Sequence, residues 1–240
     1  MDELSTLKLK VARCCRMFHM AGLFDSGGHV SARIPGTDRI LIHPRYTSRP
    51  QVRADDILTV DLSGKLVNGK DEPPSETPIH TCIYRSRPDV LSVAHLHSHY
   101  ATLLGISGQK FLPVTTSGIM FTSHGVPIFR HAWNIGDDQK GMALVKALGQ
   151  ARATLMRGHG SVAVADSLEG VFILSQQLEK SARFQIEMMQ IGTRRSLPPS
   201  EVKLALKEAF SPHRIMKDWV YNESIGEMAG IFEGVEYGIE

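Results

Sequence analysis

Apolar residues recur along the chain with two different spacings, which predict helices and strands that alternate. Where they return every three or four positions, as Leu7, Val11 and Phe18 do, one face of a helix is apolar. Glycine or proline ends several of these patterns: Gly22 follows the first and Pro88 the second. The segments predicted to be helical are residues 2–20, 75–87, 100–106, 137–151, 167–191 and a last helix from about residue 200.

Strands are predicted where short runs rich in β-branched residues lie between turn residues. Gly27-Gly28 opens the first run, and Ser63-Gly64 separates a later pair. The predicted strand segments are residues 29–34, 39–44, 56–62, 65–67, 90–97, 153–156 and 161–165. Short strands mix with helices on both sides, and no linker or repeat divides them. The pattern therefore favours a single α/β domain with a mixed sheet.

Composition and charge narrow the class of protein. The 240 residues are 42% hydrophobic and 22% charged, as in ordinary globular proteins. A net charge of +2 is too small for the electrostatic footprint of a nucleic-acid-binding protein. Three cysteines cannot form a disulfide framework and suit a reducing compartment. The N-terminal segment is charged where a signal peptide is apolar, and no apolar run reaches the roughly 18 residues of a membrane span. We expect a cytoplasmic protein with neither a nucleic-acid nor a membrane partner.

Histidine is the unusual part of the composition, with 11 residues, eight of them between His29 and His131. The sharpest local motif is His95-Leu96-His97, at the end of a predicted strand. Side chains two positions apart share one face of a strand, so both imidazoles can reach the same ion. Imidazole is the usual ligand of zinc and also suits iron, nickel or copper, and catalytic sites typically take three protein ligands. The same motif, taken alone, also fits ordinary packing or an exposed surface.

Two further positions could complete such a site. His159 lies between two glycines in a turn that joins two apolar strands, where an imidazole can project, although a plain hairpin tip has the same sequence. Glu76 begins a helix that Ser75 is predicted to cap, and His80 follows one turn later on the same face. A carboxylate there is favoured by the helix N-terminus alone. Its functional interpretation is a general acid/base beside a metal-bound substrate.

Taken together, these residues resemble the class II aldolase/adducin family. The matching segments are GGHVSAR (27–33), LIHP (41–44), PSETPIH (74–80), RPDVLSVAHLHSHYATLL (87–104) and LMRGHGSVAVAD (155–166). The resemblance implies a three-layer α/β/α domain around a mixed, largely antiparallel sheet. It also implies that His95, His97 and His159 hold one divalent metal ion per subunit (zinc, manganese or iron) and that Glu76 is the catalytic acid/base.

The resemblance covers most of residues 5–190 and extends to assembly. It implies a homotetramer with active sites near the subunit interfaces. We expect a catalytic domain over residues 1–198 and a helical tail over residues 199–240, which would cover the active site or a subunit interface. The sequence beyond Pro212 is ambiguous in its secondary structure.

The predicted substrate-binding residues depart from those of sugar-phosphate aldolases in the resembling family. Those enzymes hold phosphate with an Asn in the glycine-rich loop, a Thr-Gly pair after the second strand and a Ser-Ser pair before the glutamate. This chain has His29, Arg45-Tyr46 and Pro74-Ser75 at these places. Arginine can hold a carboxylate with two hydrogen bonds, and Tyr or His can lie against a planar ring. His29, Arg45, Tyr46 and Ser75 are therefore predicted to bind a small anionic substrate; a solvated Arg45 and a His29 packed in its turn are the alternatives.

The form of the first loop resembles the family branch that decarboxylates hydroxylated aromatic or heteroaromatic carboxylates and related ring-cleavage acids. The leading hypothesis is therefore a metal-dependent decarboxylase. Retro-aldol cleavage of a hydroxy-keto acid or sugar derivative is the first alternative, and an iron-dependent oxygenase is the second. Adducin-like relatives are scaffolds that lack the metal histidines, whereas this chain has all three.

Overall fold

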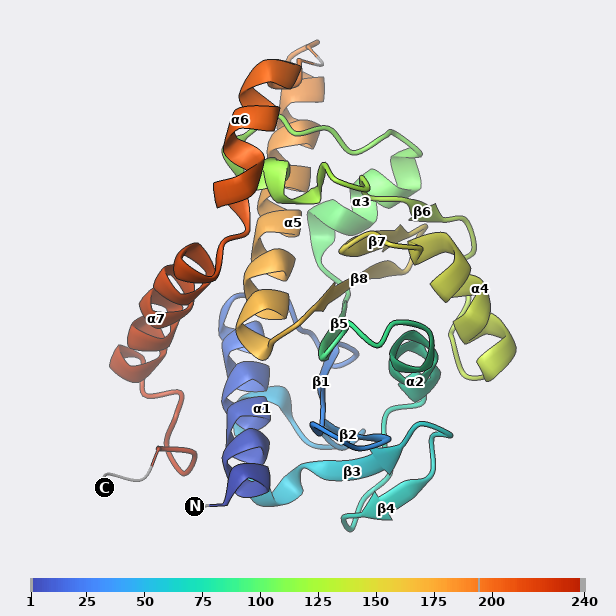
Figure 1. Ribbon diagram of the computed structural model, residues 1–240, viewed down its shortest axis with the longest axis vertical. Helices are drawn as coiled ribbons and strands as arrows, with labels where there is room; N and C mark the ends of the chain where they lie inside the picture. The colour runs from blue at the N-terminus through green and yellow to red at the C-terminus, as the bar shows by residue number, and fades with distance from the viewer. Residues whose placement is uncertain (1, 194, 238–240) are drawn as a thin grey trace.

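The computed structural model describes residues 2–193 and 195–237, which alternate between helices and strands (Figure 1). The helices are α1 (Glu3–Met20), α2 (Thr77–Ser86), α3 (His99–Ser107), α4 (Asp138–Leu148), α5 (Leu168–Gln190), α6 (Pro199–Ala209) and α7 (Pro212–Met228). The strands are β1 (His29–Arg33), β2 (Arg39–Ile42), β3 (Leu58–Asp61), β4 (Leu66–Asn68), β5 (Ser92–Leu96), β6 (Ile128–Phe129), β7 (Ala153–Met156) and β8 (Gly160–Ala165).

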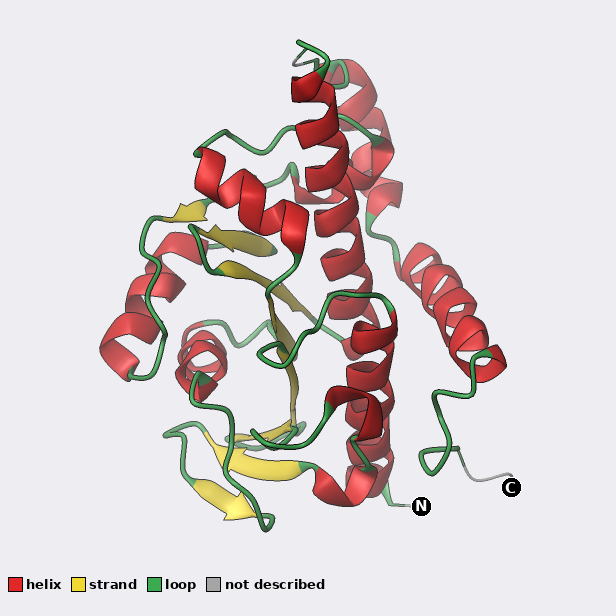
Figure 2. Ribbon diagram, turned by 180° about the vertical axis from the view of Figure 1, so that it is seen from behind, coloured by secondary structure: helices red, strands yellow, loops and turns green. Residues whose placement is uncertain are grey.

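Within the described residues, the strands form one eight-stranded sheet in the order β4-β3-β2-β1-β5-β8-β7-β6. Neighbouring strands are antiparallel except β6 and β7, which are parallel. Helices α1, α3 and α5 cover one face of the sheet, and α2 and α4 cover the other (Figures 1 and 2). The prediction of a three-layer α/β/α fold with a mixed, largely antiparallel sheet is confirmed. The two-residue strand β6 was not predicted, because its short VPIF segment carries no alternating pattern.

Strand β8 is buried along its whole length because both faces of the sheet are covered. Its side chains alternate between two cores: Val162 and Val164 pack toward α2 and α4, and Ala163 and Ala165 pack toward α1 and α5. On β5 the same alternation directs His95 to the α2 side, since Val93 belongs to that core and Ala94 to the other. The face of the sheet under α2 therefore carries the first of the predicted metal histidines.

The start of α2 differs from its prediction, because Ser75 does not cap the helix. Glu76 is the N-cap residue, makes no side-chain capping bond, and directs its buried carboxylate into the protein. Ser75 is exposed. Pro78 in the first turn has no N–H group to satisfy, and Thr77 closes the turn through its hydroxyl on the Pro74 carbonyl. A serine cap is therefore not needed, and the glutamate is left free for the site.

The C-terminal residues form two further helices on the outer side of the α1/α5 layer (Figure 1). Trp219 of α7 is buried with its ring 5.8 Å from that of Phe172 on α5. Beyond α7 the chain returns to α1, where the buried Arg13 guanidinium lies over the rings of Phe232 and Tyr237. Arg13 also binds carboxylates of α7, so the end of the described chain is fixed to the first helix.

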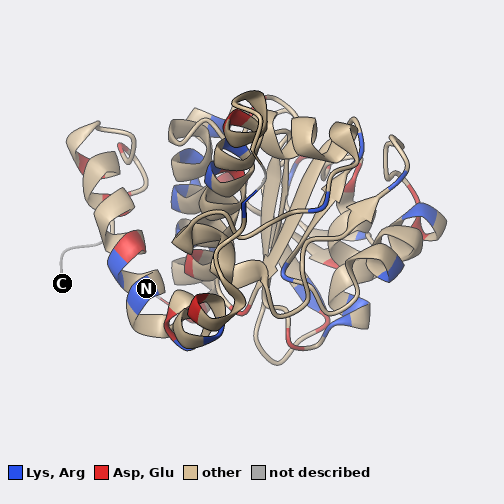
Figure 3. Cartoon of the chain, turned by 90° about the horizontal axis from the view of Figure 1, so that it is seen from above, with Lys and Arg blue, Asp and Glu red and all other residues tan. Residues whose placement is uncertain are grey.

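Charged residues of both signs are interspersed on the outer helices, and the central strands carry few of them (Figure 3). This distribution agrees with the small net charge of the sequence. Among residues 2–193 and 195–237, no helix has the length and apolar character needed to cross a membrane.

Candidate active site

Three histidines and one glutamate from three separate segments meet at the end of β5 and the β7–β8 turn. His95 is in β5 and His97 directly follows it; His159 is in the turn, and Glu76 precedes α2. One possible ligand atom from each of the four residues lies within 4.8 Å of the others. The structure thus brings together the four residues that were predicted to hold the metal ion and to act as acid/base.

The spacing of these atoms fits a single ion. His95 Nε2 lies 3.0 Å from His97 Nε2, and Glu76 Oε2 lies 3.5 Å from both His95 Nε2 and His159 Nε2. Imidazole nitrogens bound to zinc lie about 2.0–2.1 Å from the metal, so two ligands of one ion are about 3–3.5 Å apart. A divalent ion could therefore bind among the Nε2 atoms with Glu76 beside it.

Backbone carbonyls orient two of the histidines for this role. His95 Nδ1 donates to the Ser161 carbonyl at 3.1 Å, and His159 Nδ1 donates to the Trp133 carbonyl at 2.8 Å. A proton held on Nδ1 leaves the lone pair on Nε2, which is the form that binds a metal. The donor set is thus already in the required tautomer at both residues.

The third histidine is oriented by Asp25, which the sequence reasoning missed. Asp25 Oδ2 accepts a hydrogen bond from His97 Nδ1 at 3.2 Å, and Oδ1 accepts from the amides of Gly27 and Gly28. Either glycine with a side chain would collide with a neighbouring ring, and at Gly27 that ring is His97. The Asp-Ser-Gly-Gly sequence was a visible sign of this turn, but nothing in it indicated contact with a residue 72 positions away.

Replacing Asp25 by asparagine is expected to weaken zinc binding by about 10–100-fold, the usual cost of losing a carboxylate behind a metal histidine. The amide oxygen would keep the two glycine bonds, so the NH₂ group would face His97 Nδ1 and favour the wrong tautomer. Zinc affinity measured by competition with a chelator tests this. Asp61→Asn is the matched control, since Asp61 also accepts from two turn amides but contacts no histidine. Equal loss in both variants would contradict the role of Asp25.

The Glu76 carboxylate is buried and held from two sides. Oε1 accepts from the Ile135 amide at 2.8 Å, and Oε2 faces His95 and His159. Burial alone would raise the pKa of Glu76, but the adjacent imidazoles of His159 and His95 and the Ile135 amide outweigh it and hold the pKa well below the usual range. Glu76 is therefore a carboxylate at neutral pH and can accept a proton.

The glycines around His159 allow the turn to reach the site. A side chain at Gly160 would overlap the Leu96 carbonyl of the neighbouring strand, and Gly158 has a φ of 69° that favours glycine. Strand β8 can therefore pair closely with β5 beside His95 and His97.

The four predicted substrate-binding residues occupy different surroundings. His29 is buried, with its ring centroid 5.0 Å from that of His95. Arg45 and Tyr46 are exposed and line a cavity of about 600 Å³ together with Asp25. Arg45 also lies 3.6 Å from the carboxylate of Glu72. Ser75 is exposed next to Glu76. The structure thus places His29 beside His95, whereas Arg45 and Tyr46 line a cavity that they share with Asp25.

An exposed aromatic pair lies on the loop that supports Glu76 and His159. The rings of His131 and Trp133 are stacked, with centroids 3.8 Å apart and planes 16° from parallel. The same loop supplies the Trp133 carbonyl to His159 and the Ile135 amide to Glu76. A stacked surface therefore borders the cluster, at a place where the sequence alone gave His131 no defined role.

Further histidines are buried without charge, and this predicts acid sensitivity. Burial lowers the pKa of His43 and of His80 to about 3, against 6.5 for free histidine. Below pH 6.5 the unfolded chain binds protons that the folded chain does not, so stability should fall as the pH drops from about 6.5 toward 4. Each such group contributes up to about 1.4 kcal/mol per pH unit.

Replacing His43 by leucine should therefore reduce this pH dependence. His43 Nε2 is buried without a partner among the described residues. The substitution therefore removes a titrating group without breaking a hydrogen bond to Nε2. Urea midpoints of the metal-free protein between pH 7.5 and 5 measure the effect, and His19→Leu at an exposed position is the control. An unchanged pH dependence in His43→Leu would contradict the assignment.

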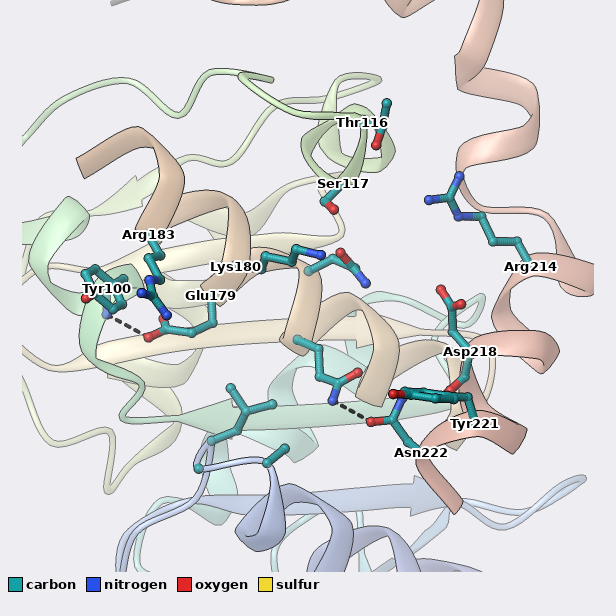
Figure 4. Close-up of a pocket in the computed structure, with 15 residues that line it drawn as sticks. Tyr100, Thr116, Ser117, Glu179, Lys180, Arg183, Arg214, Asp218, Tyr221 and Asn222 are labelled. Atoms are coloured by element: carbon teal, nitrogen blue, oxygen red, sulfur yellow. Dashed lines mark hydrogen bonds between the residues drawn. The ribbon is translucent and has the colours of Figure 1, made fainter. Parts of the chain in front are cut away.

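A second cavity, of about 670 Å³, lies between α5 and α7, away from the predicted site residues (Figure 4). Lys180 and Arg183 of α5 and Arg214 and Asp218 of α7 line it. The cluster of histidines is not part of this cavity, so it is separate from the candidate active site.

Comparison with known proteins agrees with the fold and with the motifs. Residues 9–186 match the sequence model of the Class II Aldolase and Adducin N-terminal domain. The chain is 30% identical over 204 residues to 3,4-dihydroxyphthalate decarboxylase from Rhodococcus jostii, covering 79% of this chain and 83% of the relative. It is 26% identical over 183 residues to 5-deoxy-D-ribulose 1-phosphate aldolase from Bacillus thuringiensis, covering 76% and 85%.

A solved structure shares the whole fold. The crystal structure of an aldolase II superfamily protein from Pseudomonas syringae matches with a TM-score of 0.85 at 22% identity, over 96% of each chain. The family resemblance predicted from the motifs is thereby confirmed. Because the family model spans most of its residues, the chain belongs to the class II aldolase and adducin family.

Proposed function

We propose that this class II aldolase-like lyase is a metal-dependent decarboxylase of a hydroxylated aromatic or heteroaromatic carboxylate or a related ring-cleavage acid. The observation that carries the proposal is the set of three oriented imidazole Nε2 atoms with an ionised Glu76 beside them. The decarboxylase relative at 30% identity supports the reaction, since 3,4-dihydroxyphthalate is a dihydroxylated aromatic dicarboxylate. Zinc, manganese and iron(II) all suit three imidazole ligands, and we propose one such ion per subunit.

His95, His97 and His159 would hold the ion. Three neutral ligands would leave it a full charge of +2, which would polarise the carboxylate and hydroxyl of the substrate and stabilise negative charge on the substrate oxygen. The residues of the chain supply the proton chemistry. Glu76 takes the proton of the substrate hydroxyl and delivers it to the ring carbon that carries the carboxylate. The bond to the carboxylate then breaks, its electron pair returns to the ring, and carbon dioxide leaves.

The surrounding residues would bind the rest of the substrate. In this proposal His29 contacts a polar group beside the metal, and Arg45 holds a second anionic group from the cavity that it shares with Asp25. Tyr46 and the stacked His131–Trp133 pair offer faces for a planar ring. Ser75, exposed before Glu76, would donate a hydrogen bond to a substrate oxygen.

Retro-aldol cleavage of an unphosphorylated hydroxy-keto acid or sugar derivative is the second candidate. The aldolase relative supports it, and the same metal and carboxylate would serve it: Glu76 would take the hydroxyl proton, and a carbon–carbon bond would break to release an aldehyde. His29 replaces the expected Asn in the first loop and so removes a phosphate-binding amide, which disfavours a phosphorylated substrate like that of the aldolase relative.

A screen of ortho-hydroxy aromatic acids and of hydroxy-keto acids tests the proposal. Protein loaded in turn with zinc, manganese and anaerobic iron(II) should release carbon dioxide from at least one aromatic acid. Release of an aldehyde from a hydroxy-keto acid, with no carbon dioxide from any aromatic acid, would overturn it in favour of the aldolase. Iron-dependent oxygen uptake would instead indicate an oxygenase.

We also propose a homotetramer with active sites near its interfaces. Large apolar side chains are exposed near the end of α5 and on the tail (Ile191 79%, Leu204 84% and Met228 89%), which is typical of surfaces buried in an assembly. Residues 199–240 would contribute to that interface. Light scattering after size-exclusion chromatography should give four times the mass of the 26.5 kDa chain, and a monomer would contradict this.

A further inference from the structure

The cluster of Glu76, His95, His97 and His159 is called the metal cluster below. A line of four buried polar side chains leads from it into the interface between β1 and α2. His29 Nδ1 lies 2.6 Å from His80 Nε2, and His80 Nδ1 lies 2.6 Å from Ser31 Oγ. Ser31 Oγ lies 2.8 Å from the Tyr84 hydroxyl. All four side chains are at most 2% exposed. This chain of hydrogen bonds is called the His29–Tyr84 chain below.

The secondary structure explains why these residues meet. His29 and Ser31 are two positions apart and share one face of β1, and His80 and Tyr84 are four apart and share one face of α2. Packing α2 onto that face interleaves the two pairs. A chain of this kind excludes water, so each contact needs one proton between its two atoms.

The last contact sets the direction of the protons. The Tyr84 hydroxyl also lies 3.1 Å from the Ser31 carbonyl, which can only accept, so Tyr84 donates there. With its single proton directed to the carbonyl, Tyr84 accepts from the Ser31 hydroxyl. His80 Nδ1–H then donates to Ser31, and His29 Nδ1–H donates to His80. In the reverse order Tyr84 would donate to Ser31 Oγ, and of these two hydroxyls only that of Ser92 would donate to the Ser31 carbonyl.

The direction of donation along the His29–Tyr84 chain decides whether His29 Nε2 carries a proton or a lone pair. With its proton on Nδ1, His29 has a lone pair on Nε2, and this atom has no hydrogen-bond partner among the described residues. His29 is paired across the strands with His95, and the two ring centroids are 5.0 Å apart. His29 Nε2 is thus an unused hydrogen-bond acceptor beside His95, in a side chain of which only 2% is exposed.

We propose that His80, Ser31 and Tyr84 are positioning residues that fix the tautomer of His29, and that His29 Nε2 selects a substrate with a hydroxyl group at this place. The second half rests on the proposed function. A hydroxyl donates to the lone pair, whereas a methyl ether leaves the lone pair unpaired and a carboxylate is repelled by it. The preferred substrate class is therefore a ring with a second hydroxyl next to the chelating one.

Nitrogen-15 NMR of histidine-labelled protein tests the tautomer without any turnover. In the wild-type protein the His29 proton should be on Nδ1, with the signal assigned by its loss in His29→Gln. Tyr84→Phe removes the acceptor of the Ser31 hydroxyl, whose proton then turns to His80. The chain should reverse and place the His29 proton on Nε2, three hydrogen bonds from the substitution.

Binding to the zinc-loaded protein tests the selectivity. The wild-type protein should bind 2,3-dihydroxybenzoate at least about tenfold more tightly than 2-hydroxy-3-methoxybenzoate, the usual cost of one unpaired buried group. Tyr84→Phe should lose this preference and keep its zinc. Calorimetry measures both ligands and the metal content is measured in parallel.

Ser92→Ala is the matched control, because Ser92 is buried and donates to the same Ser31 carbonyl at 2.9 Å but lies outside the chain. It should leave the His29 tautomer and the preference unchanged. A His29 proton on Nε2 in the wild-type spectrum overturns the proposal, even if Tyr84→Phe fails to fold, and so does an unchanged tautomer in a folded Tyr84→Phe. A correct tautomer in a protein that decarboxylates none of the screened acids would instead contradict the proposed function.

Discussion

Replacing His159 by alanine is expected to weaken zinc binding by at least about a hundredfold and to abolish turnover. His159 supplies one of three Nε2 atoms, and structural zinc sites with four ligands bind with about 10–16 kcal/mol, so one ligand is worth about 3 kcal/mol. The fold should survive, since the His159 side chain is in a turn and its lost partners are only the Trp133 carbonyl and the Glu76 carboxylate. Competition with a chelator gives the affinity, and circular dichroism reports the fold.

His124→Ala is the control for this variant, because His124 is exposed and belongs to no group of metal-ligand atoms among the described residues. It should keep the zinc affinity and the activity of the wild-type protein. Zinc binding that is equally strong in His159→Ala would place the ion elsewhere. A loss of zinc in both variants would point to a general effect of removing histidine from the surface around the site.

The sequence predicted the elements better than their ends, and the reason is visible at α2. Periodicity located the helix, but the choice of N-cap depended on where the Glu76 carboxylate found partners. Those partners, His95, His159 and the Ile135 amide, are 19 to 83 positions further along the chain. No local pattern contains that information, so Ser75 was predicted to cap a helix that begins without it.

In the metal cluster, too, local patterns predicted some features, and contacts between distant residues determined the others. Two of its histidines could be placed on one strand face from spacing alone, because alternation is a local property of β5. His159 and Glu76 were joined to them through resemblance to a family, since only the order of strands in the sheet brings them near. The groups that orient the histidines were missed: Asp25 acts across 72 positions, and the Ser161 and Trp133 carbonyls belong to the backbone and leave no mark in the sequence.

The His29–Tyr84 chain was also beyond local reasoning, although three of its four members belong to segments that carry the family resemblance. His29 and Ser31 are in the first loop segment, and His80 follows the glutamate. Their contact depends on how α2 packs against β1. This packing is determined by the burial of two apolar faces. Buried polar groups are thus positioned by hydrophobic packing and then fix the chemistry of the site through tautomers.

Replacing Glu76 by glutamine is expected to lower kcat by about 10²–10⁴-fold, the usual contribution of a general acid/base. Glutamine has nearly the same shape, and its carbonyl oxygen can still accept from the Ile135 amide. It cannot take the proton of a substrate hydroxyl. Since His95, His97 and His159 all remain, the metal content should stay close to that of the wild-type protein, and KM should change little.

Glu76→Asp separates charge from position in the same experiment. Aspartate keeps the negative charge but withdraws the carboxylate by one methylene group, so an activity between those of the wild type and Glu76→Gln is expected. Glu187→Gln, at a surface residue that pairs with Arg183, controls for the loss of a carboxylate. Full activity in Glu76→Gln would assign the proton transfer to another group. If zinc were lost together with activity, Glu76 would be a metal ligand and not the acid/base, and the proton would then have to reach the ring carbon from water.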